Sequence, residues 1–244
     1  MRPFGGRLGA RPLCLGRETL RLERWLPLYR EICDEFGFDE SEDRASATFL
    51  SSILGERGSE AFDAFSASRL PETAVLCGGG DSLASDISSL SERDYIVAAD
   101  GATSLVMERG LLPDVIVTDL DGVIEDQVEA NARGSIIFVH AHGDNREALA
   151  TWVPEFSGRI VGTCQCEPVG RMFNFGGFTD GDRAACVLAE LGVKRILLAG
   201  FDLEHPSRKP GRSAEVKMRK LAWAARILAM VAEGCVSIEP VVTR

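Results

Sequence analysis

Apolar residues in the first part of the chain recur at spacings of three and four positions, which is the period of one helix face. The pattern runs over residues 22–36 and 49–65, and the sequence Ser-Arg-Leu-Pro at 68–71 then interrupts it. We therefore expect a small N-terminal helical unit over residues 21–70. Residues 1–20 are basic and glycine-rich and lack the apolar centre of a secretory signal, so we expect a loose extension there.

Beyond residue 70 the pattern changes to short, almost wholly apolar runs. Most of them lie roughly twenty residues apart, which is enough for a helical crossover between parallel strands. Runs without polar alternation indicate strands that are covered on both faces. The six runs are residues 74–77, 95–98, 115–118, 136–139, 159–162 and 195–199. Residues 71–244 are thus expected to form an α/β doubly wound domain with a mostly parallel sheet, in which 184–191 and 218–228 belong to covering helices.

Composition excludes several classes of protein. The net charge of −10 argues against a protein that grips nucleic acid, because that affinity depends on clustered Lys and Arg. No apolar stretch approaches the ~20 residues that a membrane-spanning helix needs. The seven cysteines are an odd number in mostly apolar contexts, so we expect a reducing cytoplasm and no disulfide framework. Cys164 and Cys166 form a CxC without a second pair nearby, which is a poor zinc signature.

Glycine and carboxylate residues follow nearly every predicted strand. In open parallel sheets, ligands bind beyond the carboxyl ends of the strands. The strand exits read CGGGDSL at 77–83, AADGA at 98–102, TDLDG at 118–122, HAHGDN at 140–145 and GFD at 200–202, and FGGFTDGDRA at 175–184 precedes a helix. Taken singly, Asp81, Asp182 or Asp202 is better explained as a helix cap. Together at one edge of one sheet, such carboxylates would repel each other unless cations neutralised them, which indicates a magnesium site.

Asp119 and Asp121 are the sharpest pair in this set. At a spacing of two along an extended chain their side chains lie on the same side, while Leu120 points towards the core. The two carboxylates could therefore share one Mg²⁺ together with substrate phosphates. The other reading is a solvated acidic turn, which the preceding apolar strand and the following Gly122 disfavour.

Two further exits carry weaker signals. Gly78, Gly79 and Gly80 suggest backbone that approaches a phosphate, but neither a GxGxxG nor a phosphate-loop motif is complete, and a plain tight turn also explains them. His140 and His142 form an HxH that could bind zinc or iron with Asp144. Because oxygen ligands outnumber imidazoles at this edge, we favour substrate or phosphate contacts for the histidines.

If the histidines contact substrate or phosphate, Asp144 joins the carboxylates that bind magnesium. Lys217 and Lys220, one turn apart on a predicted helix, could meet a polyphosphate, but a solvated helix face explains them better. His205 has no such context and is left unassigned.

The motifs CGGGDSL, AADGA, PDVIVTDLDG, HAHGDN, GGFTDGDRA and LLAGFD, in this order, closely resemble the archaeal 6-hydroxymethyl-7,8-dihydropterin pyrophosphokinase family. The resemblance covers about residues 21–235, and that family is itself similar to thiamin pyrophosphokinases. It implies a fold like the thiamin pyrophosphokinase catalytic domain. Here Thr118, Gly122 and Phe178 replace the Gly, Ser and Arg of the thiamin family's motifs, which fits the pterin family better.

The resemblance implies transfer of the terminal diphosphate of ATP to the hydroxymethyl oxygen of a reduced pterin, with release of AMP and with Mg²⁺ as cofactor. It implies a metal group of Asp100, Asp119, Asp121 and Asp144, the last three also catalytic. The proton acceptor is left open between a carboxylate and His142. The implied nucleotide-binding residues are Gly78, Gly79, Gly80, Ser82, Gly101 and Asn145. The implied substrate-binding residues are Gly176, Gly177, Asp180, Asp182 and His140.

Three alternatives remain at this point. A thiamin pyrophosphokinase would perform the same chemistry on another alcohol. A glycosyltransferase would use the DxD pair to bind a nucleotide-sugar diphosphate through a metal, and a non-catalytic module would only bind the nucleotide. The sequence predicts ATP and a reduced pterin alcohol as partners, with neither nucleic acid nor membrane, and leaves the oligomeric state open, a homodimer included.

Overall fold

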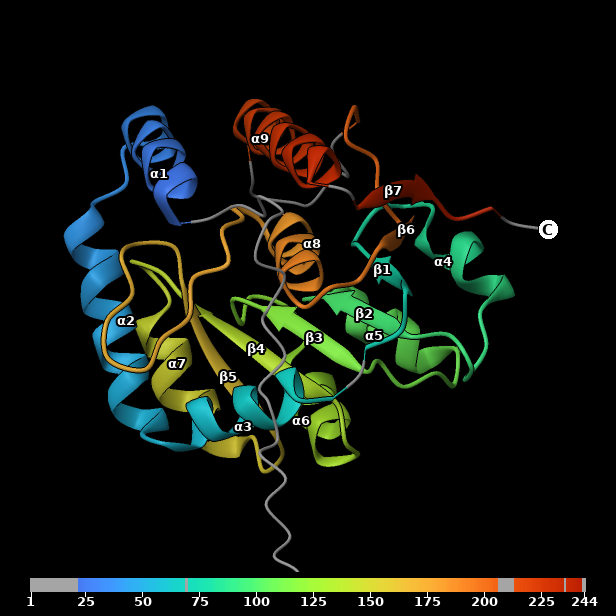
Figure 1. Ribbon diagram of the computed structural model, residues 1–244, viewed down its shortest axis with the longest axis horizontal. Coiled ribbons are helices and arrows are strands. Elements are labelled where there is room, and N and C mark those ends of the chain that lie inside the picture. Colours follow the sequence, from blue (N-terminus) through green and yellow to red (C-terminus); the bar gives the residue numbers. More distant parts are fainter. Residues whose placement is uncertain (1–21, 69, 206–212, 235, 243–244) are drawn as a thin grey trace, which may run out of the picture.

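A computed structural model describes residues 22–68, 70–205, 213–234 and 236–242 (Figure 1). Its centre is one seven-stranded sheet in the order β5-β4-β3-β2-β1-β6-β7, in which every neighbouring pair of described strands is parallel. The strands are β1 (Thr73–Cys77), β2 (Ile96–Ala99), β3 (Val115–Thr118), β4 (Ile136–Ala141), β5 (Ile160–Cys164), β6 (Arg195–Ala199) and β7 (Ser237–Pro240). The predicted parallel sheet is confirmed.

Helices cover both faces of this sheet. The crossovers contain α4 (Leu83–Asp86), α5 (Ala102–Glu108), α6 (Ile124–Ala132), α7 (Arg146–Trp152), α8 (Asp180–Glu190), and the short 3-10 helices η1 (Ile87–Ser89) and η2 (Val153–Glu155). Along β1, Ala74 and Leu76 belong to one apolar cluster, whereas Val75 and Cys77 belong to another with residues of α4 and α5. Since successive side chains of a strand point to opposite faces, the sheet is doubly wound, as predicted.

The covering helices α8 and α9 (Ala214–Glu233) lie on one side of the sheet. Figure 1 shows α8 between the sheet and α9, and α8 contacts β1, β2 and β3. α9 contains the predicted segment 218–228, and α8 contains the predicted segment 184–191 except for its last residue, Leu191, which caps the helix. Strand order reverses between β1 and β6, because β1 to β5 extend the sheet one way and β6 returns beside β1.

The six predicted strands lie within two residues of their expected bounds, but β7 was missed. Its sequence SIEP has no apolar run, and its residues are exposed or half-buried. As an edge strand with a single neighbour, it needs little apolar surface.

Three helices precede the sheet: α1 (Leu22–Phe36), α2 (Glu40–Leu54) and α3 (Arg57–Ser66). Trp25, Leu50 and Phe65 from these helices are buried in the same apolar cluster as Phe138 of β4. The Phe65 and Phe138 ring centroids are 5.7 Å apart. The helical N-terminal unit thus shares the core of the sheet, and its separation as a unit at residue 70 stays a prediction.

The prediction for residues 1–20 lies outside the described residues. Within the described part of the chain, no helix combines the length and apolar character needed to cross a bilayer. The cysteines described there are free and buried.

Candidate active site

The exits of β2 and β3 bring three carboxylates together. Oxygen atoms of Asp100, Asp119 and Asp121 lie within 4.8 Å of one another, and we call these residues the acidic cluster. Asp100 is buried, Asp119 is half-buried and Asp121 is exposed, so the cluster leads from the end of the sheet to solvent. Asp100 Oδ1 accepts hydrogen bonds from Thr118 Oγ1 at 2.7 Å and from Gln127 Nε2 at 3.0 Å, which orients this carboxylate.

The backbone at this edge adopts a conformation that the sequence pattern did not indicate. Asp100 and Leu120 have φ values of 41° and 67°, the left-handed region that non-glycine residues rarely adopt. Leu120 is buried as expected, but the chain at Leu120 is turned and not extended. The assumption that an extended chain aligns Asp119 and Asp121 was therefore wrong. A left-handed turn is present between them, and such backbone at a strand exit is typical of functional sites.

The donor atoms of the cluster fit a hard cation. All three residues offer carboxylate oxygens, the ligand type that Mg²⁺ and Ca²⁺ prefer. Asp119 Oδ1 is buried and has no hydrogen-bond partner in the described part of the chain. A buried acceptor without a partner costs free energy unless something else satisfies it. The geometry therefore fits a divalent metal ion at the acidic cluster.

Burial and mutual repulsion set the protonation of these groups. Burial raises the pKa of Asp100 to about 6, opposed by the Thr118 hydrogen bond and reinforced by the charges of Asp119 and Asp121. Burial also acts to raise the pKa of Asp119, but the neighbouring His142, Arg183 and Lys220 together lower it below its usual value. The site thus keeps Asp119 ionised while it disfavours the charge on Asp100.

These shifts predict how stability depends on pH without divalent metal. Between pH 4 and 6 the native protein holds a proton on Asp100 that the unfolded chain releases, so stability should fall as pH rises through this window. A shift of this size corresponds to about 3 kcal/mol. Denaturant unfolding in a chelator at pH 4.5 and pH 7 measures this change in the free energy of unfolding. Burial also raises the pKa of Asp182 to about 6, so Asp182 contributes to the same fall in stability with rising pH in the wild type. The Asp100→Asn variant should therefore lose less unfolding free energy between pH 4.5 and pH 7 than the wild type. An equal loss in both proteins would show that Asp100 does not hold the proton.

Gly122 is required by the packing of the cluster. A Cβ atom at this position would lie 2.6 Å from Asp100 Oδ2, closer than real contacts allow. We expect Gly122→Ala to displace the Asp100 carboxylate and to weaken divalent-metal binding about tenfold. Calorimetric titration with Mg²⁺ measures the effect, with Val123→Ala, whose side chain is exposed, as the matched control. Equal affinities in both variants would contradict the expectation.

His142 connects the acidic cluster to the exit of β4. Its Nε2 lies 3.4 Å from Asp119 Oδ2, and its Nδ1 lies 2.5 Å from Asp144 Oδ1. The Asp144 side chain is 89% exposed and lies across the imidazole from Asp119. The structure therefore brings His142 to the predicted site, whereas a metal role for Asp144 stays a prediction.

His140 and Asn145 lie deeper in the same exit. His140 Nδ1 is 3.1 Å from Thr163 Oγ1, and burial lowers the pKa of this histidine, with Arg183 and His142 adding, so its ring is neutral. Asn145 Nδ2 donates to the carbonyls of Asp119 at 2.9 Å and His140 at 2.7 Å, which ties the exits of β3 and β4 together. Substrate contact by His140 and nucleotide contact by Asn145 stay predictions.

The turn before α8 places Asp180 near the cluster. Burial and the charge of Asp119 raise the pKa of Asp180 well above its usual value, and Arg183, whose Nη1 is 2.8 Å from Asp180 Oδ1, opposes the rise. Asp182 is fully buried and accepts hydrogen bonds from the backbone of Phe178 and Thr179. With Thr179 it forms a capping box. A substrate contact for Asp182 stays a prediction, and capping is the role that the structure shows.

Two glycines make this turn possible. Gly176 and Gly177 have φ values of 80° and 95°, and a Cβ atom on Gly177 would overlap the backbone of Arg183. Their predicted substrate contacts are not tested by this geometry.

The glycine loop after β1 has a packing explanation. Gly78 N and Gly80 N donate to the carbonyls of Ala199 and Gly200, at 2.8 and 2.7 Å. A Cβ atom at Gly80 would lie 2.5 Å from the Gly200 carbonyl oxygen. The loop thus packs against the exit of β6, whereas Cβ positions at Gly79 and Gly101 face open space. Ser82 donates to Asp86. Nucleotide binding by all of these residues stays a prediction.

A buried polar network that the sequence analysis missed reaches this site from α2. Asp43 Oδ2 accepts hydrogen bonds from Tyr29 Oη at 2.6 Å and Gln165 Nε2 at 2.7 Å, and its Oδ1 accepts from Gly143 N at 2.7 Å. Gly143 lies between His142 and Asp144. One signal was available, because Asp43 precedes Ala47 by four positions and so lies on the apolar face of α2.

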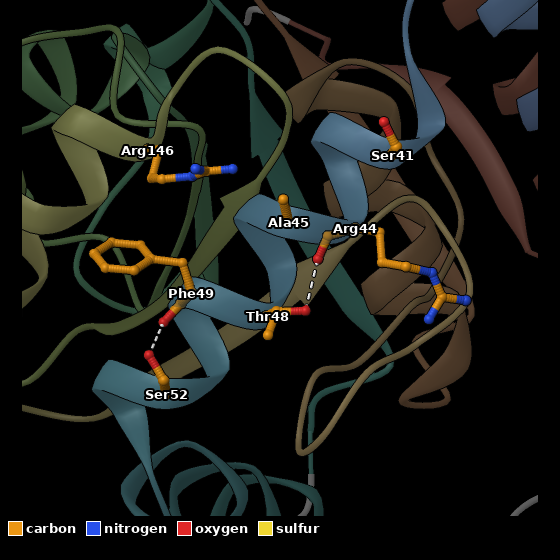
Figure 2. Close-up of a pocket in the computed structure, with 7 residues that line it drawn as sticks. All are labelled: Ser41, Arg44, Ala45, Thr48, Phe49, Ser52 and Arg146. Atoms are coloured by element: carbon orange, nitrogen blue, oxygen red, sulfur yellow. Dashed lines mark hydrogen bonds between the residues drawn. The ribbon is translucent and has the colours of Figure 1, made fainter.

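A separate groove of about 500 Å³ lies on the outer side of α2 (Figure 2). Its lining residues are Ser41, Arg44, Ala45, Thr48, Phe49, Ser52 and Arg146. None of them belongs to the acidic cluster.

A doubly wound sheet with carboxylates gathered at neighbouring strand exits defines an α/β protein with a candidate site for a divalent metal ion at one edge of the sheet. Residues 50–208 match the model of the family described as "6-hydroxymethylpterin diphosphokinase MptE-like". The chain belongs to this family, as the resemblance of its motifs predicted.

Curated relatives carry the name 6-hydroxymethyl-7,8-dihydropterin pyrophosphokinase. The protein from Methanothermobacter thermautotrophicus is 41% identical over 86% of this chain and 94% of its own length. The Pyrococcus furiosus protein is 40% identical over 86% and 93%, and the Methanocaldococcus jannaschii protein is 34% identical over 85% and 94%. Their names agree with the diphosphotransferase class and the archaeal pterin enzymes that the motifs predicted.

A solved glycosyltransferase structure from Magnetospirillum magneticum AMB-1 shares 13% identity, with a TM-score of 0.47 over 72% of this chain and 34% of that protein.

Proposed function

We propose that this protein transfers a diphosphate group from ATP to the hydroxymethyl oxygen of 6-hydroxymethyl-7,8-dihydropterin, with AMP as the second product. The acidic cluster carries this proposal, because its Asp119 Oδ1 has no partner among the described residues and because diphosphate transfer requires neutralised phosphates in a fixed position. Membership of the pterin diphosphokinase family supports the choice of acceptor. The product would serve pterin cofactor synthesis, of the tetrahydromethanopterin or folate type.

In this proposal Asp100, Asp119 and Asp121 would hold Mg²⁺. A bound Mg²⁺ supplies neutralisation of phosphate charge during the transfer. The residues of the chain do the positioning: Asn145 fixes the exit of β3 against the exit of β4, and Thr118 orients Asp100. Arg183 Nη1 pairs with Asp180 Oδ1 at 2.8 Å, and both residues interact electrostatically with Asp119.

His142 is our proposed acceptor for the proton of the pterin alcohol. His142 Nδ1 lies 2.5 Å from Asp144 Oδ1 and its Nε2 lies 3.4 Å from Asp119 Oδ2, so the two carboxylates would stabilise the positive charge that His142 gains when it accepts the alcohol proton. His142→Gln should lower kcat about a hundredfold, because the amide cannot accept the proton of the alcohol. Unchanged kcat would assign the proton to a carboxylate instead.

The overall reaction is tested with purified protein, ATP and Mg²⁺. The reduced pterin alcohol, thiamin and a nucleotide sugar in place of ATP are assayed separately. We expect stoichiometric AMP and pterin diphosphate with the pterin only. AMP release with thiamin would assign the related thiamin enzyme, and sugar-nucleotide turnover without ATP use would assign a glycosyltransferase. Light scattering determines the oligomeric state, which the sequence leaves open, a homodimer included.

A further inference from the structure

Three phenylalanines form a compact group at the end of α1, which we call the aromatic cluster: Phe36, Phe38 and Phe178. The Phe36 ring stacks on Phe38 with centroids 5.5 Å apart and an interplanar angle of 13°, and it meets Phe178 at 5.2 Å. Phe38 and Phe178 are 6.3 Å apart. Phe178 is 8% exposed, whereas Phe38 is 40% exposed. The cluster therefore presents one accessible ring on a rigid aromatic base.

Two cations of α9 border the aromatic cluster. The Arg219 guanidinium lies 4.7 Å from the Phe36 ring centroid, and its charge is matched by Glu35 at 2.8 Å. Lys220 Nζ lies 5.6 Å from the Phe178 ring centroid. Within the described part of the chain, no carboxylate lies within ion-pair distance of Lys220. The charge of Lys220 also helps to lower the pKa of Asp119, so the cation beside Phe178 acts electrostatically on the acidic cluster.

Phe178 also ties the aromatic cluster to the acidic side of the site. The carbonyl of Phe178 accepts from Arg183 Nη2 at 3.0 Å, and Arg183 Nη1 pairs with Asp180. The Phe178 backbone N–H donates to the buried Asp182 at 2.7 Å. Because these contacts fix Phe178 in the turn before α8, the aromatic cluster cannot shift independently of Asp180.

A single exposed phenylalanine needs no explanation, but this ring has specific neighbours. It adjoins Phe178, whose ring lies 5.6 Å from Lys220 Nζ. A ligand with a flat ring attached to phosphate, or to the group that receives phosphate, could contact the aromatic cluster with its ring and the acidic cluster, through a metal ion, with its other end. Stacking of such a ring on an aromatic side chain contributes a large part of its affinity and tolerates different heterocycles.

On the basis of the proposed function, we propose that Phe38, Phe178 and Lys220 form the subsite for a planar nitrogen heterocycle of one of the two substrates, the adenine of ATP or the pterin ring. The connection between α1 and α2 would then supply part of the substrate site through Phe38. The two sources share the same ring chemistry, and binding measurements separate them.

The test uses calorimetric titration of the full chain with three probes in Mg²⁺: a non-hydrolysable ATP analogue, 6-hydroxymethylpterin, and inorganic pyrophosphate, which has no ring. We expect Phe38→Leu to weaken at least one ring-bearing probe about tenfold and to leave pyrophosphate binding unchanged. Phe38→Trp should restore the affinity. Ile53→Ala, an exposed apolar residue on α2, is the control for general surface effects.

Each outcome decides the proposal. The ring-bearing probe whose affinity falls in Phe38→Leu shows whether the adenine or the pterin ring occupies the subsite. Unchanged affinity for both ring-bearing probes, an equal loss for pyrophosphate, or a wild-type chain that binds neither ring would overturn the subsite. If the wild type binds a ring through Phe38 but transfers no diphosphate, the subsite stands and the proposed reaction fails.

Discussion

Asp121→Asn is expected to lower kcat/KM at least about a thousandfold while the protein stays folded. Asp121 is the exposed member of the acidic cluster, so the substitution removes a charge and a ligand oxygen without opening the core. Since the reaction needs several kcal/mol of charge neutralisation on the phosphates, loss of one carboxylate should affect turnover far more than folding. Steady-state AMP release with the pterin alcohol measures the effect.

The same variant should not destabilise the protein in the absence of divalent metal. Removing one of three adjacent charges relieves repulsion, as the raised pKa of Asp100 already indicates. Glu125→Gln, an exposed carboxylate in the first turn of α6, removes the same charge nearby and should keep turnover within about twofold. Full turnover by Asp121→Asn, or an equal loss in Glu125→Gln, would show that the acidic cluster does not bind the catalytic metal.

The sequence alone was sufficient to predict the sheet and the gathering of Asp100, Asp119 and Asp121 at one of its edges. Apolar runs marked six of the seven strands because strands covered on both faces need apolar side chains throughout. Asp100 and Asp119 could be assigned to one site because neighbouring parallel strands end at the same edge. Both inferences depend on local pattern and on a general rule of topology.

Features that arise from contacts between distant segments could not be predicted in this way. The left-handed turn at Leu120 exists because the surrounding structure enforces it, and no residue type marked it. Arg183 and Lys220 influence Asp119 from helices far along the chain. Lys220 was interpreted as part of a solvated face, since periodicity gives no information on what a helix end approaches in space.

The buried Asp43 is the clearest case of such a long-range contact, and its loss should have a large effect. Asp43→Ala removes the acceptor for Tyr29 Oη, Gln165 Nε2 and Gly143 N, all part of a buried or half-buried network. Burial and the neighbouring Asp43 raise the pKa of Tyr29, so its hydroxyl stays a donor. We expect the free energy of unfolding to fall by about 3 kcal/mol, because three donors lose their partner.

Turnover should fall as well, since Gly143 lies between His142 and Asp144 and its N–H is held by Asp43. Tyr29→Phe removes one of the three hydrogen bonds and should cost about 1 kcal/mol in the wild type but almost nothing in Asp43→Ala, because the two residues act through the same bond. Asp34→Ala, an exposed carboxylate on α1, is the control for removal of charge. Denaturant unfolding of the four variants, Asp34→Ala, Asp43→Ala, Tyr29→Phe and the double variant, gives the coupling energy directly. If Tyr29→Phe costs as much in the Asp43→Ala background as in the wild type, the network does not link α1 and α2 to the exit of β4.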